Sequence, residues 1–84
     1  MHLDIITPEQ TLFSGEVKSV QLPGSAGSFE VLDNHAPLIS TLDPGKIRVR
    51  TNDGQEEYFE VESGFVEVLN NKATVLIEGA TSLE

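Results

Sequence analysis

The chain has no cysteine, no tryptophan and few basic residues, and each of these scarcities excludes a class of function. Without a thiol there is no disulfide, no thiolate nucleophile, no Cys-ligated zinc and no iron–sulfur cluster, an absence that fits a reducing cytoplasm. Only 5 Lys and Arg residues stand against 14 Asp and Glu residues, which gives a formal net charge of -9. Such a charge argues against nucleic acid as a partner and favours solubility.

Long apolar stretches are also missing. The longest unbroken run is Val75-Leu76-Ile77, whereas a transmembrane helix needs about 18 or more apolar residues in succession. The first residues of the chain lack the basic segment and the apolar segment of a secretory signal. We therefore expect a chain that does not itself cross a bilayer.

Helical periodicity is absent as well, because no segment of about ten residues repeats apolar side chains at spacings of three and four. Glycine or proline interrupts the chain every few residues, and short stretches rich in Val, Ile, Leu and Phe lie between them. This rhythm predicts an all-β fold. The expected strands cover residues 3–7, 16–22, 28–32, 37–42, 46–51, 55–63, 64–69 and 72–78.

So many strands in 84 residues predict a sandwich or a barrel. A single flat sheet would leave the apolar side of each strand uncovered, so two layers are expected to face each other across one core. No internal repeat, low-complexity tract or linker divides the sequence. The prediction is one domain over residues 1–84, a small two-layer antiparallel β-sandwich.

Two hairpins allow the strand register to be predicted. A three-residue loop, Asn52-Asp53-Gly54, with Gly54 in the left-handed region, places Ile47 opposite Phe59 on the core side. On the outer side the same register pairs mainly opposite charges, which are favourable cross-strand neighbours. These outer pairs are Lys46 with Glu60, Arg48 with Tyr58, and Arg50 with Glu56.

The last hairpin is predicted to turn at Asn70-Asn71, two residues that tolerate positive φ. This register turns Val66 and Val75 inward and leaves Phe65 beside Leu76 on the outer side. Two large apolar side chains on an outer face form a sticky patch, and Tyr58 or Val20 would extend it if the order of the strands permits. The alternative is that a loop or the other layer covers them.

No reactive constellation emerges from the polar residues. The two histidines, His2 and His35, have no metal-ligand spacing around them. Asp33 and His35 are one residue apart but lack a positioned nucleophile, so an acid–base pair there is disfavoured. The acidic residues of the 56–62 strand alternate outward beside a basic strand, which is typical of a solvated edge rather than a cation site. We expect no catalytic residue, no metal site and no cofactor.

Residues 23–28 form a glycine-rich segment, Pro-Gly-Ser-Ala-Gly-Ser. It lacks the Lys-Ser/Thr ending of a phosphate loop, and no helical pattern follows it, so it is not a nucleotide cradle. Its structural reading is a turn between strands. Its functional reading is an exposed tip whose small side chains let another backbone approach closely.

Read as a whole, the chain resembles the epsilon subunit of the bacterial rotary ATP synthase, which is equivalent to the mitochondrial delta subunit. The most characteristic block is Asn34-His35-Ala36-Pro37-Leu38-Ile39, followed by Pro44-Gly45-Lys46-Ile47. The resemblance runs through nearly the whole chain in the order of the family. Its further segments are residues 2–9, 12–17, 22–29, 63–68 and 73–76.

The resemblance implies a β-sandwich of about ten short strands and a non-catalytic rotor subunit. In this family the domain sits at the foot of the central stalk, on the cytoplasmic face of the bacterial inner membrane. There it binds the gamma subunit and the polar loops of the membrane proteolipid (c) ring, and it couples ion translocation to ATP synthesis. Members commonly continue into a two-helix hairpin that is absent from these residues, so the nucleotide binding and inhibition known for that hairpin are not assigned to them.

Two sets of contact residues follow. The resemblance places the proteolipid ring against the glycine-rich tip, at Ser25, Ala26, Gly27 and Ser28. In many relatives the position matching Ser28 is acidic, so the resemblance implies no ion pair with the ring here. The gamma subunit is expected at Thr7, His35 and Ser40 from the resemblance, and at Phe65 and Leu76 from their outward phase.

Two other classes of function remain open. A small free-standing β-sandwich that binds carbohydrate would fit the strand pattern, although four Phe, one Tyr and no Trp offer little surface for stacking on sugars. An enzyme that uses Asp33 and His35 is the other alternative. Binding to a gamma homologue would separate the rotor subunit from the binding module, and loss of an activity on His35→Ala would support the enzyme.

Overall fold

The computed structural model describes residues 1–78 and 81–82, and this part of the chain is built from strands. Within it there is no helix with the length and apolar character needed to cross a membrane. The all-β prediction is confirmed. The strands are β1 (His2–Ile6), β2 (Thr11–Gly24), β3 (Gly27–Leu32), β4 (Leu38–Leu42), β5 (Gly45–Thr51), β6 (Glu56–Val61), β7 (Ser63–Leu69), β8 (Lys72–Glu78) and β9 (Thr81–Ser82).

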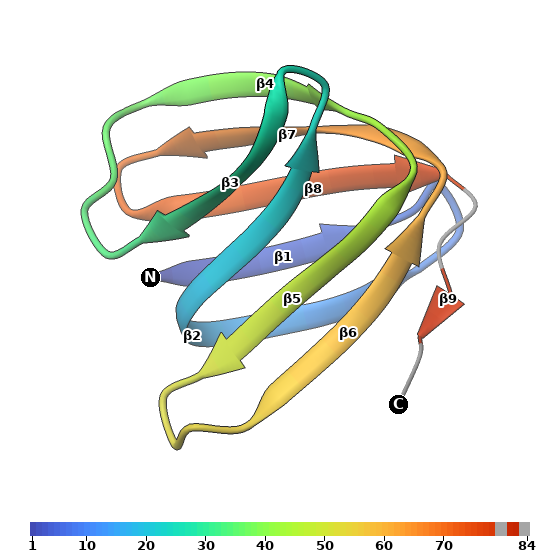
Figure 1. Cartoon of the computed structure of the whole chain (residues 1–84). Coiled ribbons are helices and arrows are strands. Elements are labelled where there is room, and N and C mark those ends of the chain that lie inside the picture. The colour runs from blue at the N-terminus through green and yellow to red at the C-terminus, as the bar shows by residue number, and fades with distance from the viewer. Residues whose placement is uncertain (79–80, 83–84) are drawn as a thin grey trace.

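The strands form two layers that face each other, as the sequence predicts (Figure 1). One layer contains β1, β8, β7 and β4, and the other contains β3, β2, β5 and β6. Strand β2 belongs to both, because its first half pairs with β1 and its second half pairs with β3 and β5. One pairing departs from the expected antiparallel arrangement, since β1 runs parallel to β8.

Strand β2 is longer than the sequence predicts. The expected strand covered residues 16–22, but β2 runs from Thr11 to Gly24. Gly15, read from the sequence as an interruption, pairs with Leu3 inside the sheet. A shift of register between Val17 and Ser19 acts as a β-bulge, so that Val17 and Val20 both become buried although they are three residues apart.

Both predicted hairpin registers are confirmed. In the β5–β6 hairpin Ile47 pairs with Phe59, and Gly54 has a φ of 89° in the loop. The outer pairs are also as predicted: Lys46 with Glu60, Arg48 with Tyr58, and Arg50 with Glu56. In the β7–β8 hairpin Asn70 and Asn71 have φ values of 52° and 61°, and Val66 pairs with Val75 and Phe65 with Leu76.

The core lies between the two layers and consists of inward-facing aliphatic side chains from both. Phe13 from the first half of β2 meets Phe59 from β6 edge to face, with ring centroids 6.3 Å apart and planes at 72°. This geometry is favourable for aromatic rings, and it ties the two halves of the sandwich together. The fully buried large side chains include Leu3, Ile5, Leu22, Ile47, Ile77, Val17, Val20, Val31, Val49, Val61, Val66 and Val68.

Candidate interaction surface

The outer face of the β1–β8–β7–β4 layer carries exposed apolar side chains. A row across it joins Ile6, Leu76, Phe65 and Thr41 on four neighbouring strands. Three of the five exposed large hydrophobic residues of the described chain occupy outward positions in this layer: Ile39 at 73%, Leu69 at 48% and Phe65 at 44% exposure. We define the apolar face as Ile6, Ile39, Phe65, Leu69 and Leu76.

The predicted outward pair, Phe65 and Leu76, thus exists, and in the described structure Phe65 is not covered by a loop or by the other layer. The order of the strands does not allow Tyr58 or Val20 to extend this pair. Val20 is fully buried, because the bulge in β2 turns it into the core, and Tyr58 lies on β6 in the opposite layer. The side chains that extend the patch are Ile6 and Ile39.

Shallow hollows mark the same face. A hollow of about 310 Å³ is lined by Glu67, Leu69, Asn70, Lys72 and Thr74, and one of about 360 Å³ lies on the other side of β7, along β4. Both include Glu67 and Leu69, so these two side chains form a ridge between them. Such open hollows suit protruding side chains of a protein partner better than an enclosed small molecule.

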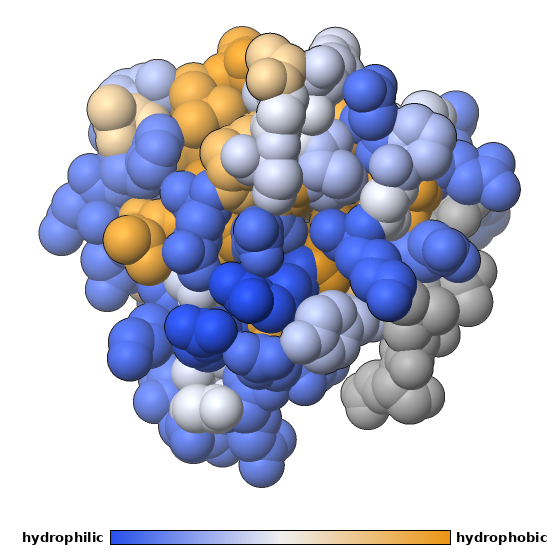
Figure 2. All heavy atoms as spheres, in the orientation of Figure 1, coloured by the Kyte–Doolittle hydropathy of each residue, from blue (hydrophilic) through white to orange (hydrophobic). Residues whose placement is uncertain are grey.

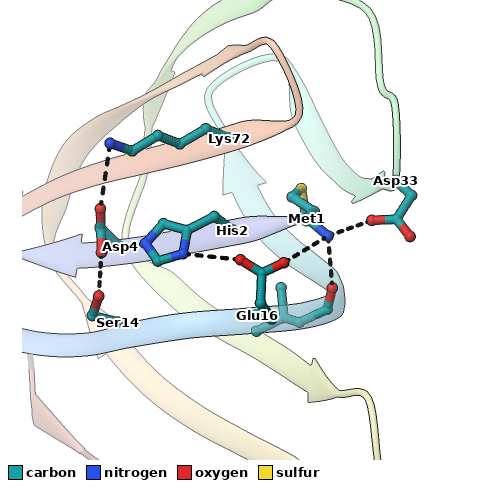
Figure 3. A network of polar contacts seen from close by, with 8 residues as sticks. Met1, His2, Asp4, Ser14, Glu16, Asp33 and Lys72 are labelled. Carbon is teal, nitrogen blue, oxygen red and sulfur yellow. Dashed lines mark hydrogen bonds and ion pairs between the residues drawn. The ribbon is translucent and has the colours of Figure 1, made fainter.

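A polar cluster borders the apolar face along β1 (Figure 3). The Asp4 carboxylate accepts a 2.6 Å hydrogen bond from the Ser14 hydroxyl and lies 3.9 Å from Lys72 Nζ. The His2 ring spans two carboxylates, with Nε2 3.1 Å from Asp4 Oδ1 and Nδ1 3.1 Å from Glu16 Oε2. The Ser14 hydrogen bond, assisted by His2 and Lys72, lowers the pKa of the Asp4 carboxyl below its ordinary value.

The Met1 ammonium lies at the end of the same cluster (Figure 3). It donates hydrogen bonds to Asp33 Oδ1 at 2.5 Å and to the Val17 carbonyl at 3.3 Å, and Glu16 Oε1 is 3.6 Å away. The hydrogen bond to Asp33 is the main cause that raises the pKa of this ammonium, against the opposing effect of burial. The cluster therefore pins the start of β1 to the β3–β4 connection.

The glycine-rich segment forms the tip of the β2–β3 hairpin. Gly24 pairs with Gly27, so Ser25 and Ala26 are the two turn residues. Gly27 has a φ of 129°, a conformation that side chains with a Cβ rarely adopt, which explains glycine at this position. Residues 25–28 are all exposed, as an exposed contact tip requires.

The tip is held against the apolar face by side-chain hydrogen bonds. Thr41 Oγ1 donates to Ser25 Oγ at 2.8 Å, and Ser25 Oγ donates to Asp43 Oδ1 at 3.0 Å. The Ser25 amide also donates to the Thr41 carbonyl at 3.0 Å. Because Thr41 pairs with Phe65 across β4 and β7, the tip and the apolar face are neighbouring parts of one surface.

The other residues predicted to contact gamma are spread around the molecule. Thr7 follows Ile6 at the end of β1, close to Leu76, and its hydroxyl accepts hydrogen bonds from the Glu9 and Gln10 amides at 3.2 and 3.1 Å. His35 is near the opposite end of β7, where the Asn34 amide donates to Asn71 Oδ1 at 2.7 Å. Ser40 pairs with Val66 and so lies on the core side of β4.

The remaining polar residues show no arrangement for catalysis in the described part of the chain. The Asp33 carboxylate is engaged by the Met1 ammonium, and the His35 Nδ1 lies 2.7 Å from the carbonyl of its neighbour Ala36. Neither contacts a hydroxyl that could serve as a nucleophile. Among residues 1–78 and 81–82, no group of three or more His, Cys, Asp or Glu side chains is placed to hold a metal ion.

Three members of the apolar face, Ile6, Ile39 and Leu69, were not identified as site residues from the sequence. Each lies next to another apolar residue in the chain: Ile5, Leu38 and Val68 respectively. Alternation alone does not say which member of such a pair points outward. The pairing of β4 with β7 decides it for Ile39, which lies opposite Glu67. The available signal in the sequence was that two apolar residues stand side by side, since only one of them can face the core of a regular strand.

The structure defines a β-sandwich domain with an exposed apolar face, and comparison with known proteins gives its family. Residues 1–83 match the model of the ATP synthase delta/epsilon chain β-sandwich domain. The ATP synthase epsilon chain of Nitratiruptor sp. is 48% identical over 84 residues, which are 100% of this chain and 65% of that protein. The epsilon chain of Chlorobium limicola is 49% identical over 76 residues, or 90% of this chain and 86% of that one. The chain belongs to the ATP synthase delta/epsilon family.

Solved structures confirm the fold. A chain in the Euglena gracilis mitochondrial ATP synthase, in a structure of OSCP, F1 and the c-ring, superposes with a TM-score of 0.90 at 20% identity. The superposition covers 96% of this chain and 52% of the Euglena chain. A chain in the central stalk and c-ring structure of the Tetrahymena thermophila mitochondrial enzyme gives a TM-score of 0.83 at 15% identity, covering 96% of this chain and 65% of that one.

Proposed function

We propose that this chain is a non-catalytic subunit of the central stalk of a proton-translocating ATP synthase, at the cytoplasmic face of the bacterial inner membrane. It docks on the gamma subunit and on the proteolipid ring, and it turns with them so that ion translocation is coupled to ATP synthesis. Relatives up to 49% identical that are ATP synthase epsilon chains support this role. The structural observation that carries it is an apolar face continuous with an exposed tip of small residues.

The gamma subunit is assigned to the apolar face. Phe65 and Leu76 form its centre with Ile6 and Ile39 beside them, and Thr7 lies at its border. Covering these side chains removes apolar area from water, which is a favourable contribution of about 25 cal/mol for each Å². His35 and Ser40 lie outside this centre, at the far end of β7 and on the core side of β4, so their contribution requires a partner that wraps around β4.

The proteolipid ring is assigned to the tip formed by Ser25, Ala26, Gly27 and Ser28. Small side chains allow close packing on the polar loops of the ring. Ser25 accepts a hydrogen bond from Thr41 and donates one to Asp43, and these two bonds hold the tip in a fixed position relative to the apolar face. A tip held by these hydrogen bonds is better suited than a free loop to transmit rotation between two partners.

The test is calorimetric titration of the chain with its cognate gamma subunit, using Phe65→Glu and, as a matched control, Leu32→Glu. Leu32 is 53% exposed on β3 in the other layer. We expect one-to-one binding of the unaltered chain with a sub-micromolar Kd, a loss of at least about tenfold for Phe65→Glu, and no change for Leu32→Glu.

Thermal unfolding of both variants distinguishes docking from folding. Because Phe65 points away from the core, we expect the melting temperature of the Phe65→Glu variant to stay close to that of the Leu32→Glu control. Absence of gamma binding by the folded, unaltered chain would contradict the proposed role. A large loss of melting temperature with normal gamma affinity would instead show that Phe65 belongs to the core.

A further inference from the structure

Glu67 lies in the middle of the apolar face. It is the outward residue of β7 between Phe65 and Leu69, and it pairs with Ile39 on β4 and with Thr74 on β8. It also lines the hollows on both sides of β7. A partner that covers Ile39, Phe65 and Leu69 must therefore cover Glu67 as well, because no route between these side chains avoids it.

No cation of the described chain forms an ion pair with this carboxylate. None of the ion pairs among residues 1–78 and 81–82 includes Glu67. Lys72, on the adjoining strand, lines the same hollow as Glu67, but its Nζ pairs with Asp4 Oδ2 at 3.9 Å. The basic residues of β5, Lys46, Arg48 and Arg50, belong to the opposite layer.

Docking an uncharged apolar surface on this face would remove the Glu67 carboxylate from water without replacing its hydration, and a buried charge without a partner is strongly unfavourable. A positively charged side chain on the partner removes the conflict, because charge-assisted hydrogen bonds to a carboxylate are strong and directional. The net charge of -9 on the chain also attracts a basic surface at longer range.

We propose that the gamma surface that binds the apolar face presents a Lys or Arg side chain to Glu67, surrounded by apolar residues that fill the hollows beside β7. This inference rests on the proposed docking of gamma and specifies the chemistry of its contact. The apolar contacts supply the affinity, and the ion pair at their centre fixes the register and rejects surfaces that lack the cation.

The experiment is calorimetric titration of the cognate gamma subunit with the unaltered chain, with Glu67→Gln and with Glu60→Gln. Glutamine keeps the size of the side chain and removes its charge. Glu60 is an exposed carboxylate on β6, in the other layer, so its variant changes the net charge equally at a site remote from the apolar face. We expect Glu67→Gln to bind about 30-fold more weakly, as for a truncated buried charge pair, and Glu60→Gln to bind as the unaltered chain does.

A charge reversal extends the test. Glu67→Lys should bind more weakly still, and substituting Glu for the gamma residue that faces it should restore part of the affinity. Melting temperatures of all variants should match, because the side chain is exposed in the free chain.

The outcomes separate this inference from the proposed function. If the unaltered chain binds gamma and Glu67→Gln binds equally well, the ion pair is overturned while the docking of gamma stands. Equal weakening by Glu67→Gln and Glu60→Gln would also overturn it, because it would show attraction by net charge alone. If the unaltered chain does not bind gamma, both the proposed function and the inference are contradicted.

Discussion

The two hairpins β5–β6 and β7–β8 have equally buried inner sides and opposite outer sides. On β5–β6 the outer residues are charged or polar, with Arg50 Nη2 2.9 Å from Glu56 Oε2 and Arg48 paired with Tyr58. Figure 2 shows this side of the molecule, where hydrophilic residues predominate over β5 and β6. On β7–β8 the outer side instead carries the cross-strand pair of Phe65 and Leu76.

The contrast between the hairpins indicates that the fold itself does not require the apolar face. Both hairpins contribute one side to the core, and β5–β6 shows that the other side can be charged and polar in the same architecture. An apolar outer row on β7–β8 is therefore evidence of a partner rather than of packing within the chain, because exposed apolar patches are unfavourable in water unless something covers them.

The largest effect is expected from a pair of neighbouring substitutions that tests the two sides of β8. Ile77 is fully buried, whereas Leu76 lies on the apolar face. Ile77→Ala should lower the free energy of unfolding by about 2–5 kcal/mol, through lost burial and the cavity left behind. Leu76→Ala should lower it by less than about 1.5 kcal/mol, yet weaken gamma binding.

Chemical denaturation and calorimetric titration of the two variants measure these quantities. Equal destabilisation by both substitutions would remove the distinction between the inner and outer sides. Normal gamma binding by Leu76→Ala would contradict the assignment of Leu76 to the gamma contact and leave that contact to the other residues of the apolar face.

The next effect concerns the tip beside the apolar face. Ala26→Trp should leave the melting temperature unchanged, because Ala26 is an exposed turn residue, and should reduce co-purification with the proteolipid ring. Gly27 is a poor site for this test, since its φ of 129° makes any side chain there a source of strain. Asn52→Trp, in the exposed β5–β6 loop, is the control and should co-purify normally. Recovery of Ala26→Trp with the ring at the unaltered level would argue against the tip as the contact.

The smallest effect is expected at the polar border of the apolar face. The pKa of Asp4 is lowered in the folded chain from its ordinary value of 3.8, so its ionised form stabilises the fold above that value. This contribution is lost as the pH falls through the lowered pKa. Asp4→Asn should therefore be slightly less stable at neutral pH and should lose less stability between neutral pH and about pH 3. Urea denaturation at several pH values measures this, and parallel pH profiles of the two chains would contradict it.

Much of the fold could be predicted because alternation and turn chemistry are local. The loop Asn52-Asp53-Gly54 and the turn Asn70-Asn71 set the registers of their hairpins, and a register once set determines every cross-strand pair in it. The outward position of Phe65 and Leu76 follows in the same way. These predictions needed no knowledge of how the hairpins pack together.

Long-range pairing was beyond such reasoning. The parallel contact of β1 with β8 joins residues about seventy positions apart, and no local pattern specifies it. The division of β2 between the layers depends on Gly15 remaining in the sheet and on a bulge near Ser19. The candidate site shows the same limit. Thr41 joins the tip to the apolar face through its contacts with Ser25 and Phe65, and the three residues lie on separate strands or turns.

The all-β class, the turns and the alternation of each hairpin follow from the order of the amino acids alone, because steric preferences of Asn and Gly and the two-residue period of a strand act over a few residues. The order of the sequence motifs also indicated the family. Which outer face is apolar as a whole depends on how the strands pack together, since Ile6, Ile39, Phe65 and Leu76 come from four strands. That packing likewise places Glu67 at the centre of that face, because a surface exists only once separate strands lie side by side.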